Sequence, residues 1–296
     1  MPLTDLPADF VASNQPDPDW LAGLPGLLGR LAERWELAIG PHFAGIRINY
    51  VAPATRADGT RCVLKVSRHV DETRNEIAAL RLWEGVGAAR LLAADPDSGA
   101  LLTERLDPGS TLVAVSDADD VAATAIAADV VARLWRPVPD PAASGLRTLS
   151  SWCVAFDCNR EALASGAGGF PATLFHRVDA LRHELLTTTE EPVSLHGDLH
   201  HYNVLRGRAG QWLAIDPKGL VGDRCFDVCQ FLRNPHRVSP QTNRDRLGIF
   251  CAELGLDRAR VGAWCVVHAM LDACWEYEDG NDWRPAVAWV EEAMSF

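Results

Sequence analysis

The sequence predicts an α+β fold of two lobes, a β-rich N-terminal lobe over residues 1–106 and a mainly helical C-terminal lobe over residues 107–296. Three observations favour this fold class. The chain of 296 residues exceeds the usual size of a single hydrophobic core. β-Prone runs and a hairpin signal gather in its first third, and apolar residues at helical spacing dominate the remainder.

The elements expected in the N-terminal lobe are three strands and one helix. The β-prone runs are residues 46–51, 62–66 and 101–106. Asp58-Gly59 indicates a tight hairpin turn before the second run. Residues 71–83 combine helix formers with an apolar helical repeat, and Asp107-Pro108-Gly109 ends the third strand. We therefore place the lobe boundary near Leu106.

Helical patterns dominate the C-terminal lobe. The expected helices are residues 118–135, 148–165, 171–187, 243–255, 258–279 and 283–293. Short strands are expected only within residues 193–216, and residues 137–144 form a candidate loop.

The charge of the chain excludes one class of partner. The formal net charge is −12, whereas nucleic-acid backbones select basic surfaces. Residues 107–296 hold 26 acidic and 17 basic residues, so most of the excess lies in the C-terminal lobe. Such a field attracts cationic ligands, although surface solubility is an equally good reason for it.

The sequence also indicates a cytoplasmic protein without a membrane partner. Residues 1–20 carry no Lys or Arg, unlike a secretion signal, and no stretch approaches the ~18 uncharged apolar residues of a membrane helix. The eight cysteines include no C-x-x-C pair. We expect them to be reduced, buried thiols.

The residues richest in chemistry lie between two apolar runs. Residues 196–203 read H-G-D-L-H-H-Y-N and are flanked by candidate strands. After a turn at residues 207–210, an alternating strand ends at Asp216. A hairpin would return Asp216 beside the loop that carries Asp198 and Asn203.

These three residues supply what phosphoryl transfer requires. The reaction needs a carboxylate to accept the proton of the attacking hydroxyl and hard oxygen ligands for Mg²⁺. Asp198 can be the base, and Asn203 and Asp216 offer oxygens to the metal. Taken singly, each residue is better explained as a cap or turn residue, but their joint spacing favours catalysis.

A zinc site is the alternative for this segment. His196, His200 and His201 include a pair four residues apart, as on a helical zinc site. Gly197 and the flanking strands disfavour a helix here, so we reject this interpretation.

Lysine usage supports a phosphate site. Only Lys65 and Lys218 are lysines among 28 basic residues, and a compact ammonium at a phosphate is poorly replaced by arginine. Lys65 lies in an apolar strand and needs a partner. Glu76 shares a helical face with apolar residues and is the expected partner, the alternative being a solvated glutamate.

The loop, the lysine and the glutamate resemble those of the aminoglycoside phosphotransferases, relatives of the protein kinases. Residues 196–203 match the catalytic pattern H-G-D-x-x-x-x-N completely. The resemblance implies a protein-kinase-like fold, ATP and Mg²⁺ as cofactors, Asp198 as catalytic base, and Asn203 and Asp216 as metal ligands. Lys65, paired with Glu76, would hold the α- and β-phosphates.

The same resemblance assigns the rest of the nucleotide site. Residues 102–106 correspond to the strand that becomes the interlobe hinge, so the backbone around Glu104 and Leu106 would read adenine. Lys218 is a further candidate for contact with phosphates. Residues 40–45 lack the G-x-G-x-x-G pattern of a phosphate-cradling loop.

The acceptor is suggested by other segments. Residues 212–220, 223–235 and 273–276 are most similar to the streptomycin and hydroxyurea phosphotransferase branch of the family. This implies a small-molecule acceptor such as streptomycin and a role in antibiotic resistance. Hydroxyurea, an amino sugar, or no acceptor at all in a silent nucleotide-binding regulator are the alternatives.

A polar stripe on the helix at residues 258–279 bears on the acceptor. His268, Asp272 and Glu276 are spaced four apart on an otherwise apolar helix, so we expect the stripe to face water or a ligand. A solvated face and a carboxylate wall for a cationic acceptor are equally good interpretations. Asp223 and Asp227 are expected to be structural and to brace the catalytic loop.

Overall fold

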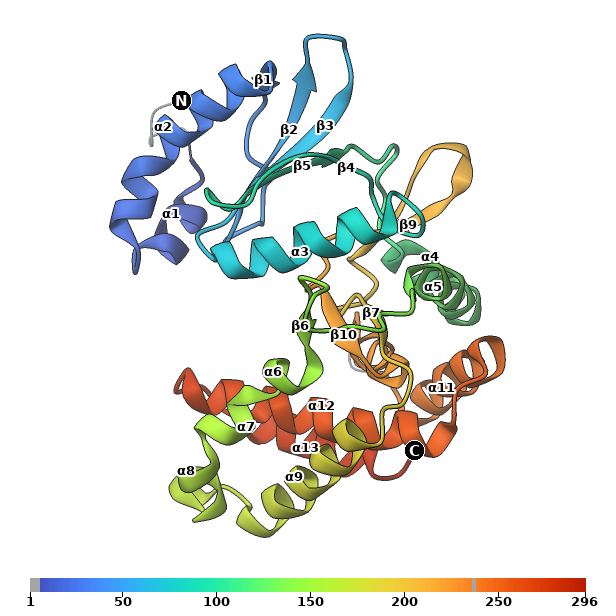
Figure 1. The fold of residues 1–296 in the computed structure, drawn as a ribbon. Coiled ribbons are helices and arrows are strands. Elements are labelled where there is room, and N and C mark those ends of the chain that lie inside the picture. The colour runs from blue at the N-terminus through green and yellow to red at the C-terminus, as the bar shows by residue number, and fades with distance from the viewer. Residues whose placement is uncertain (1–5, 236–237) are drawn as a thin grey trace.

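The computed structural model describes residues 6–235 and 238–296 of the chain. Its N-terminal part is built on one antiparallel sheet with the strand order β1-β2-β3-β5-β4 (Figure 1). The strands are β1 (Leu37–Ile39), β2 (Tyr50–Arg56), β3 (Arg61–Val66), β4 (Leu91–Asp95) and β5 (Ala100–Glu104). The expected hairpin at Asp58-Gly59 joins β2 to β3, with Gly59 at a φ of 83°.

The two faces of this sheet have different coverings. Cys62, Leu64 and Val66 of β3 are buried in one apolar cluster with α1 (Ala8–Asn14) and α2 (Pro18–Arg34). Neither of these two helices was predicted from the sequence. Alternate side chains of a strand point to opposite faces. Lys65 therefore projects to the other face, toward α3 (Val70–Trp83).

The strand expected at residues 46–51 begins later, at Tyr50, so only the end of that range is confirmed. Gly45 turns the chain with a φ of 81°, and regular pairing starts only at Tyr50. The strand then continues through Pro53, which β-propensity disfavours. Pro53 is tolerated because β1 pairs only with Ala54 and the two residues after it, so no ladder hydrogen bond is lost on that side.

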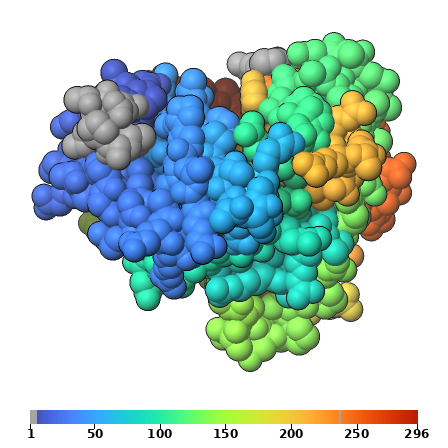
Figure 2. All heavy atoms as spheres, turned by 90° about the horizontal axis from the view of Figure 1, so that it is seen from above, coloured from blue at the N-terminus to red at the C-terminus, as the bar shows by residue number. Residues whose placement is uncertain are grey.

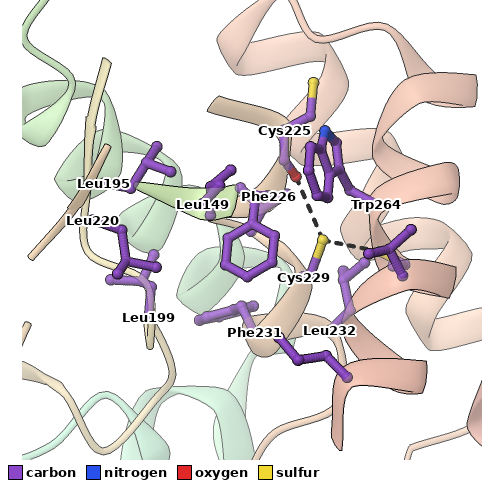
Figure 3. Packing of buried hydrophobic residues seen from close by; sticks show 14 of the residues in the cluster. Leu149, Leu195, Leu199, Leu220, Cys225, Phe226, Cys229, Phe231, Leu232 and Trp264 are labelled. Atoms are coloured by element: carbon purple, nitrogen blue, oxygen red, sulfur yellow. Dashed lines mark hydrogen bonds between the residues drawn. The ribbon is translucent and has the colours of Figure 1, made fainter. Parts of the chain in front are cut away.

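The C-terminal part is mainly helical and surrounds α12 (Figure 1). Its helices are α4 (Val113–Ala118), α5 (Asp120–Leu134), α6 (Leu149–Trp152), α7 (Val154–Cys158), α8 (Arg160–Ala164), α9 (Ala172–Thr187), α10 (Cys229–Leu232), α11 (Pro240–Leu254), α12 (Arg258–Glu278) and α13 (Arg284–Ala293). Trp264, Phe226 and Phe231 contribute large rings to the core beneath the site (Figure 3).

One long helix at residues 148–165 was expected, and the structure has the three short helices α6, α7 and α8 instead. Asn159 explains one break. Its amide donates to the carbonyl of Ala155 (2.8 Å) and to Glu278 of α12 (2.7 Å), a local bond that competes with a continuous helix.

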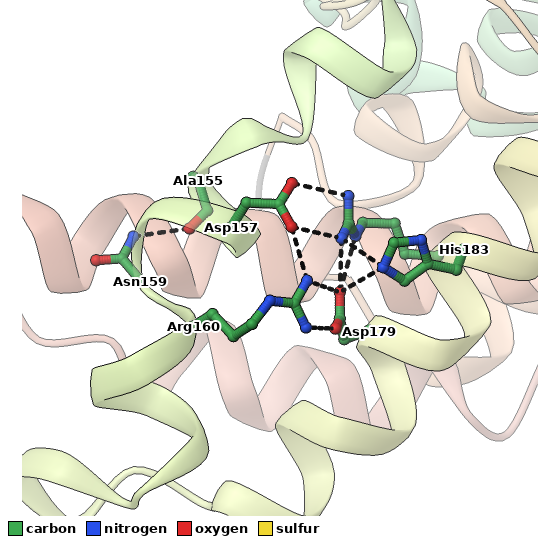
Figure 4. A network of polar contacts seen from close by, with 7 residues as sticks. Ala155, Asp157, Asn159, Arg160, Asp179 and His183 are labelled. Carbon is green, nitrogen blue, oxygen red and sulfur yellow. Dashed lines mark hydrogen bonds and ion pairs between the residues drawn. The ribbon is translucent and has the colours of Figure 1, made fainter.

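A buried ionic network fixes the short helices against α9 (Figure 4). The Arg182 guanidinium, almost fully buried, lies 2.8 Å from Asp179 and 3.0 Å from Asp157, and Arg160 contacts both carboxylates. Buried charges need such partners, so the network specifies how α7 and α8 lie on α9.

Small sheets carry the segments around the catalytic loop. The strands are β6 (Arg147–Thr148), β7 (Val193–Leu195), β8 (Val204–Arg206), β9 (Trp212–Ala214) and β10 (Leu220–Gly222), of which β6 and β10 lie outside the region expected to hold strands. β10 pairs with both β6 and β7, and β8 pairs with β9.

Three other expectations have different outcomes. All eight cysteines are free thiols, but Cys158 is exposed, so they are not uniformly buried. None of the helices in residues 6–235 and 238–296 has the length and apolar character to cross a membrane. The division into lobes near Leu106 stays a prediction.

Candidate active site

The candidate catalytic loop, residues 196–203, is held by one buried carboxylate. Asp227 accepts hydrogen bonds from the backbone N–H groups of His196 (3.0 Å) and Gly197 (2.7 Å), and from the indole N–H of Trp135 (3.1 Å). Gly197 has a φ of 80°, and a Cβ there would lie 2.7 Å from Leu220. Asp227 therefore braces the loop, whereas Asp223 binds Arg260 and Trp264 and anchors α12.

His196 joins the loop to the strand that leads to Asp216. Its Nδ1 accepts the Asp198 N–H at 3.2 Å, which leaves Nε2 protonated to donate to the Ile215 carbonyl at 2.9 Å. Burial lowers the pKa of His196 to about 4, so the ring remains neutral in this structural role.

The Asp198 carboxylate is partly shielded from water. Burial raises the pKa of Asp198 to about 7, and the charge of Lys218 acts in the opposite direction. His200 Nε2 lies 3.7 Å from its Oδ1. A carboxyl whose pKa lies near neutrality is well suited to accept and release a proton.

The hairpin β8–β9 brings Asn203 and Asp216 together. Asn203 immediately precedes β8, and Ile215 immediately follows β9. The Ile215 N–H donates to the Asn203 carbonyl at 2.9 Å, so these two ends of the hairpin are adjacent. Asn203 uses its amide N–H to bind the Asp198 carbonyl at 3.0 Å, which leaves the side-chain oxygen as a ligand. Asp216 has a φ of 58°, in the left-handed region.

Lys65 forms the expected pair with Glu76 and also contacts Asp216. Its Nζ lies 2.6 Å from Glu76 Oε2, and it donates a hydrogen bond to Asp216 Oδ1. Burial alone would lower the pKa of Lys65, but the two carboxylates raise it above its usual value. Burial also acts to raise the pKa of Asp216, but Lys65 and Lys218 hold it well below its usual range, so Asp216 is ionised.

A cavity of about 620 Å³ lies in front of these groups, and Lys65, Glu76, Asn203 and Asp216 all line it. Apolar side chains form much of the remaining wall, among them Phe43, Ile46, Val51, Val63, Leu101, Leu205 and Ile215. A mostly apolar cleft with a few convergent polar groups is typical of a ligand site.

Glu104 and Leu106 lie at the edge of the same cavity. The Glu104 side chain accepts the Arg90 N–H at 2.8 Å, so its carboxylate stabilises the turn into β4. The N–H of Leu106 has no hydrogen-bond acceptor within residues 6–235 and 238–296. From above, the β8–β9 hairpin, in orange, lies beside this segment, in green (Figure 2).

Lys218 follows the metal-ligand candidate Asp216. Its backbone N–H donates to the His196 carbonyl at 2.7 Å, and its Nζ lies 4.0 Å from Glu72 of α3. The charge of Lys218 acts on both Asp198 and Asp216, which places this ammonium close to the site where phosphate charge would accumulate.

The acidic stripe of α12 is not the open face that we expected. His268 is buried against Phe226, with ring centroids 5.3 Å apart, because its neighbours fill the core beneath the loop. Asp272 is paired with Arg233, which extends from the segment after α10. Glu276 is half-buried and adds negative charge at Arg233.

The donor set fits a hard divalent cation. Asp216 supplies an ionised carboxylate and Asn203 a free amide oxygen, both at the wall of the cavity. The described part of the chain contains no cluster of three or more His, Cys, Asp or Glu residues that could hold a metal. A metal at Asp216 and Asn203 would therefore take further oxygens from phosphates and water.

Sequence reasoning missed Trp135, whose indole N–H donates to the bracing carboxylate of Asp227 at 3.1 Å. No local signal points to this contact, because the two residues lie 92 positions apart in the chain.

A β-sheet part, a helical part and a cleft lined by a lysine–glutamate pair, an aspartate and an asparagine define a phosphotransferase with a protein-kinase-like fold. Residues 34–280 match the family described as aminoglycoside/hydroxyurea antibiotic resistance kinase, and the chain belongs to this family.

Relatives and solved structures agree with this assignment. A streptomycin 6-kinase of Streptomyces glaucescens is 36% identical over 291 residues, covering 94% of this chain and 93% of the relative. A hydroxyurea phosphotransferase of Kitasatospora aureofaciens is 36% identical over 274 residues, covering 89% and 76%. The choline kinase of Streptococcus pneumoniae is similar in fold, with a TM-score of 0.60 at 14% identity over 90% of this chain and 98% of that one. The predicted fold class and family are confirmed.

Proposed function

We propose that the protein transfers the γ-phosphoryl group of ATP, in the presence of Mg²⁺, to a hydroxyl of streptomycin or a closely related cationic aminoglycoside in the cytoplasm, and so inactivates the antibiotic. The observation that carries this proposal is the cavity at which Lys65, Glu76, Asn203 and Asp216 converge beside Asp198. A silent nucleotide-binding regulator has no need for this complete set.

Each residue has a distinct task in the proposed reaction. The apolar walls of the cavity take the adenine, and the backbone around Glu104 and Leu106 offers hydrogen bonds to its edge. Lys65, fixed by Glu76, binds the α- and β-phosphates, and Lys218 adds positive charge nearby. Mg²⁺ neutralises phosphate charge when it is bound by Asn203 and Asp216.

Asp198 carries the proton transfer. Its carboxylate takes the proton of the acceptor hydroxyl as the oxygen attacks the γ-phosphorus in line with the departing ADP. His196 and Asp227 fix the backbone of the loop, so the carboxylate does not have to be ordered during the reaction.

Streptomycin is the acceptor favoured by two observations. The streptomycin 6-kinase of Streptomyces glaucescens aligns with almost the whole chain, and the C-terminal part holds most of the excess negative charge. Asp272 and Glu276 are the proposed contacts for its guanidinium groups, and Arg233 already occupies part of that acidic site. Hydroxyurea is the second candidate, because the hydroxyurea phosphotransferase of Kitasatospora aureofaciens has the same 36% identity to this chain.

The test is a phosphotransfer assay with Mg-ATP and each acceptor separately, with products followed by mass spectrometry. We expect streptomycin to gain one phosphoryl group and the position to be readable by NMR. If hydroxyurea is phosphorylated and streptomycin is not, hydroxyurea is the acceptor. Consumption of ATP without a phosphorylated acceptor in either assay would contradict the proposal.

A further inference from the structure

The segment between β1 and β2, residues 40–49, forms part of the wall of the cavity proposed for the nucleotide. Phe43, Ile46 and Asn49 all line that cavity. The segment lacks the glycine pattern that would let backbone N–H groups cradle phosphates. Other contacts therefore have to hold this part of the wall in shape.

Backbone hydrogen bonds fix only the first half of the segment. Gly40 donates to the Pro53 carbonyl at 2.7 Å. Phe43 donates to the Val51 carbonyl at 2.9 Å, so this half follows β2. Within the part of the chain that the structure describes, residues 44–49 take part in no backbone–backbone hydrogen bond. The second half is therefore held by side chains.

Helix α1 supplies the contact to this second half. The Asn14 side chain, which is fully buried, donates through Nδ2 to the Arg47 carbonyl at 2.8 Å and to the Phe10 carbonyl of its own helix at 2.9 Å. The Arg47 guanidinium also lies 3.7 Å from the Asp9 carboxylate of α1, but both of these side chains are exposed and such a pair adds little. The buried amide of Asn14 is therefore the main link between α1 and the cavity wall.

Aromatic rings hold α1 in place against the same segment. The Phe10 ring, one helical turn before Asn14, packs on His42 with ring centroids 4.8 Å apart and on Tyr50 at 6.3 Å. His42 in turn bonds the Asn49 carbonyl through Nε2 at 3.3 Å. Phe10 and Tyr50 are fully buried. α1 is thus packed against both ends of the segment, and the Asn14 amide has a fixed position beside it.

The other half of the Asn14 amide has no partner. Its Oδ1 is buried and accepts no hydrogen bond from the described residues 6–235 and 238–296. A buried oxygen without a donor is unfavourable, so packing alone would favour an apolar side chain of the same size. The hydrogen bond to Arg47 is the feature of the structure that accounts for an asparagine here.

We propose that Asn14 is a positioning residue for the nucleotide, whose amide N–H fixes the Arg47 carbonyl and thereby holds the cavity wall at Ile46 and Asn49 in the shape that receives ATP. The inference rests on the proposed function for the identity of the nucleotide. It goes further by giving a part in nucleotide binding to α1, a helix that lines no part of the cavity itself.

The experiment compares Asn14→Leu with the wild-type protein in titrations with Mg-ATP alone. Leucine has a similar volume but offers no donor to the Arg47 carbonyl, and Asn14→Ala, which lacks the donor without adding bulk, is measured beside it. We expect the Kd for Mg-ATP to rise about 3- to 10-fold in both variants, the effect of one ordinary hydrogen bond. In the transfer assay the KM for ATP should rise similarly, and the KM for the acceptor should stay within about twofold.

The matched control is Asn243→Leu on α11. Asn243 is also buried, its Nδ2 donates to Glu292 at 3.3 Å, and its Oδ1 likewise has no donor among the described residues. Neither residue of this pair lines the nucleotide cavity. The same replacement should therefore leave the Kd for Mg-ATP unchanged, whatever it does to the melting temperature.

Two results overturn the inference. The first is a folded Asn14→Leu or Asn14→Ala protein that binds Mg-ATP within about twofold of wild type. The second is a loss of affinity in both leucine variants in proportion to their loss of melting temperature, since general destabilisation would produce this pattern. A wild-type protein that does not bind Mg-ATP contradicts the proposed function instead, so the two failures are distinguishable.

Discussion

Asp198 and Asp216 show how two neighbouring carboxylates of one site, each partly open to solvent, receive different tasks. Burial raises the pKa of Asp198 to about 7, whereas Lys65 and Lys218 overcome the same effect at Asp216 and keep its pKa low. Opposite shifts in neighbouring carboxyls are the usual sign of an acid–base group beside a permanently charged one. Of these two aspartates, Asp216 is the one that contacts the ammonium of Lys65, and this contact lowers its pKa.

We expect Asp198→Ala to reduce phosphoryl transfer by ~10²- to 10⁴-fold, because the variant lacks a proton acceptor at the hydroxyl. Binding of Mg-nucleotide should be nearly unchanged, since Lys65 and Asp216 remain. Single-turnover rates and nucleotide titrations measure the two effects separately. Wild-type turnover in this variant would show that the loop is not catalytic.

Lys65→Arg is expected to impair the enzyme, although arginine replaces lysine at almost every other basic position of the chain. The ammonium fits between Glu76 and Asp216, where the larger planar guanidinium does not. A higher KM for ATP, a lower kcat, or both should appear in steady-state kinetics. Normal kinetics would mean that Lys65 has only a structural role in β3.

At the scale of elements, the loop between β9 and β10 is locked against α3. Gly219 has a φ of 62°, and a Cβ there would lie 2.1 Å from the backbone oxygen of Asn75. Because Asn75 precedes Glu76, this contact sets the distance between the helix that carries the lysine's partner and the loop that carries Asp216 and Lys218. No side chain larger than hydrogen fits.

Gly219→Ala should therefore destabilise the fold by more than about 1 kcal/mol and raise the KM for ATP. Gly23→Ala is the control, because this helical glycine of α2 has open space around its Cβ position and the change favours the helix. Denaturant unfolding of both variants measures the difference. Equal stability would mean that the loop moves away from α3 at little cost.

Sequence reasoning located the elements of the site better than the elements around it. The loop at residues 196–203 and the return of Asp216 follow from local signals, because a hairpin joins them over a few residues. The break at Asn159 depends on Glu278, 119 residues away, and no local pattern contains it. Trp135 was missed for the same reason, since its hydrogen bond to Asp227 joins two distant segments of the chain.

The α12 stripe shows the limit of periodicity. Spacing placed His268, Asp272 and Glu276 on one face correctly, but it does not say what covers that face. Phe226 and Arg233 cover much of it, and both come from the turn after β10. Part of the stripe that was a candidate ligand surface is therefore an internal contact within the C-terminal part.

At the scale of the whole molecule, buried histidine makes stability depend on pH. Burial lowers the pKa of His268 from 6.5 to about 3, so the unfolded chain binds a proton that the native protein does not. The contribution is fully present above pH 6.5 and is lost as the pH falls from there toward 3. Between about pH 7 and pH 5, the free energy of unfolding measured in urea should therefore fall by about 2 kcal/mol less in His268→Gln than in the wild-type protein. Parallel pH profiles would contradict this.

The distribution of charge predicts how salt affects the acceptor. Residues 107–296 carry 26 acidic and 17 basic residues, so a cationic acceptor is attracted to that half. We expect the KM for streptomycin to rise with ionic strength, and Glu276→Gln to raise it at low salt. The KM for ATP is the internal comparison. A salt-independent acceptor KM would make the acidic excess a matter of solubility.

The β8–β9 hairpin is hydrogen-bonded through its backbone to two segments that precede it in the chain, residues 87–89 and residues 109–110. Ala214 exchanges hydrogen bonds with the segment between α3 and β4, to Gly87 at 2.8 Å and from Ala89 at 2.9 Å, and Gly109 donates to the Arg206 carbonyl at 2.9 Å. Both edges of the hairpin are therefore held by backbone hydrogen bonds. We expect Asn203 and Asp216 to stay in place when a nucleotide enters or leaves the cavity, because the hairpin that they flank is held on both edges.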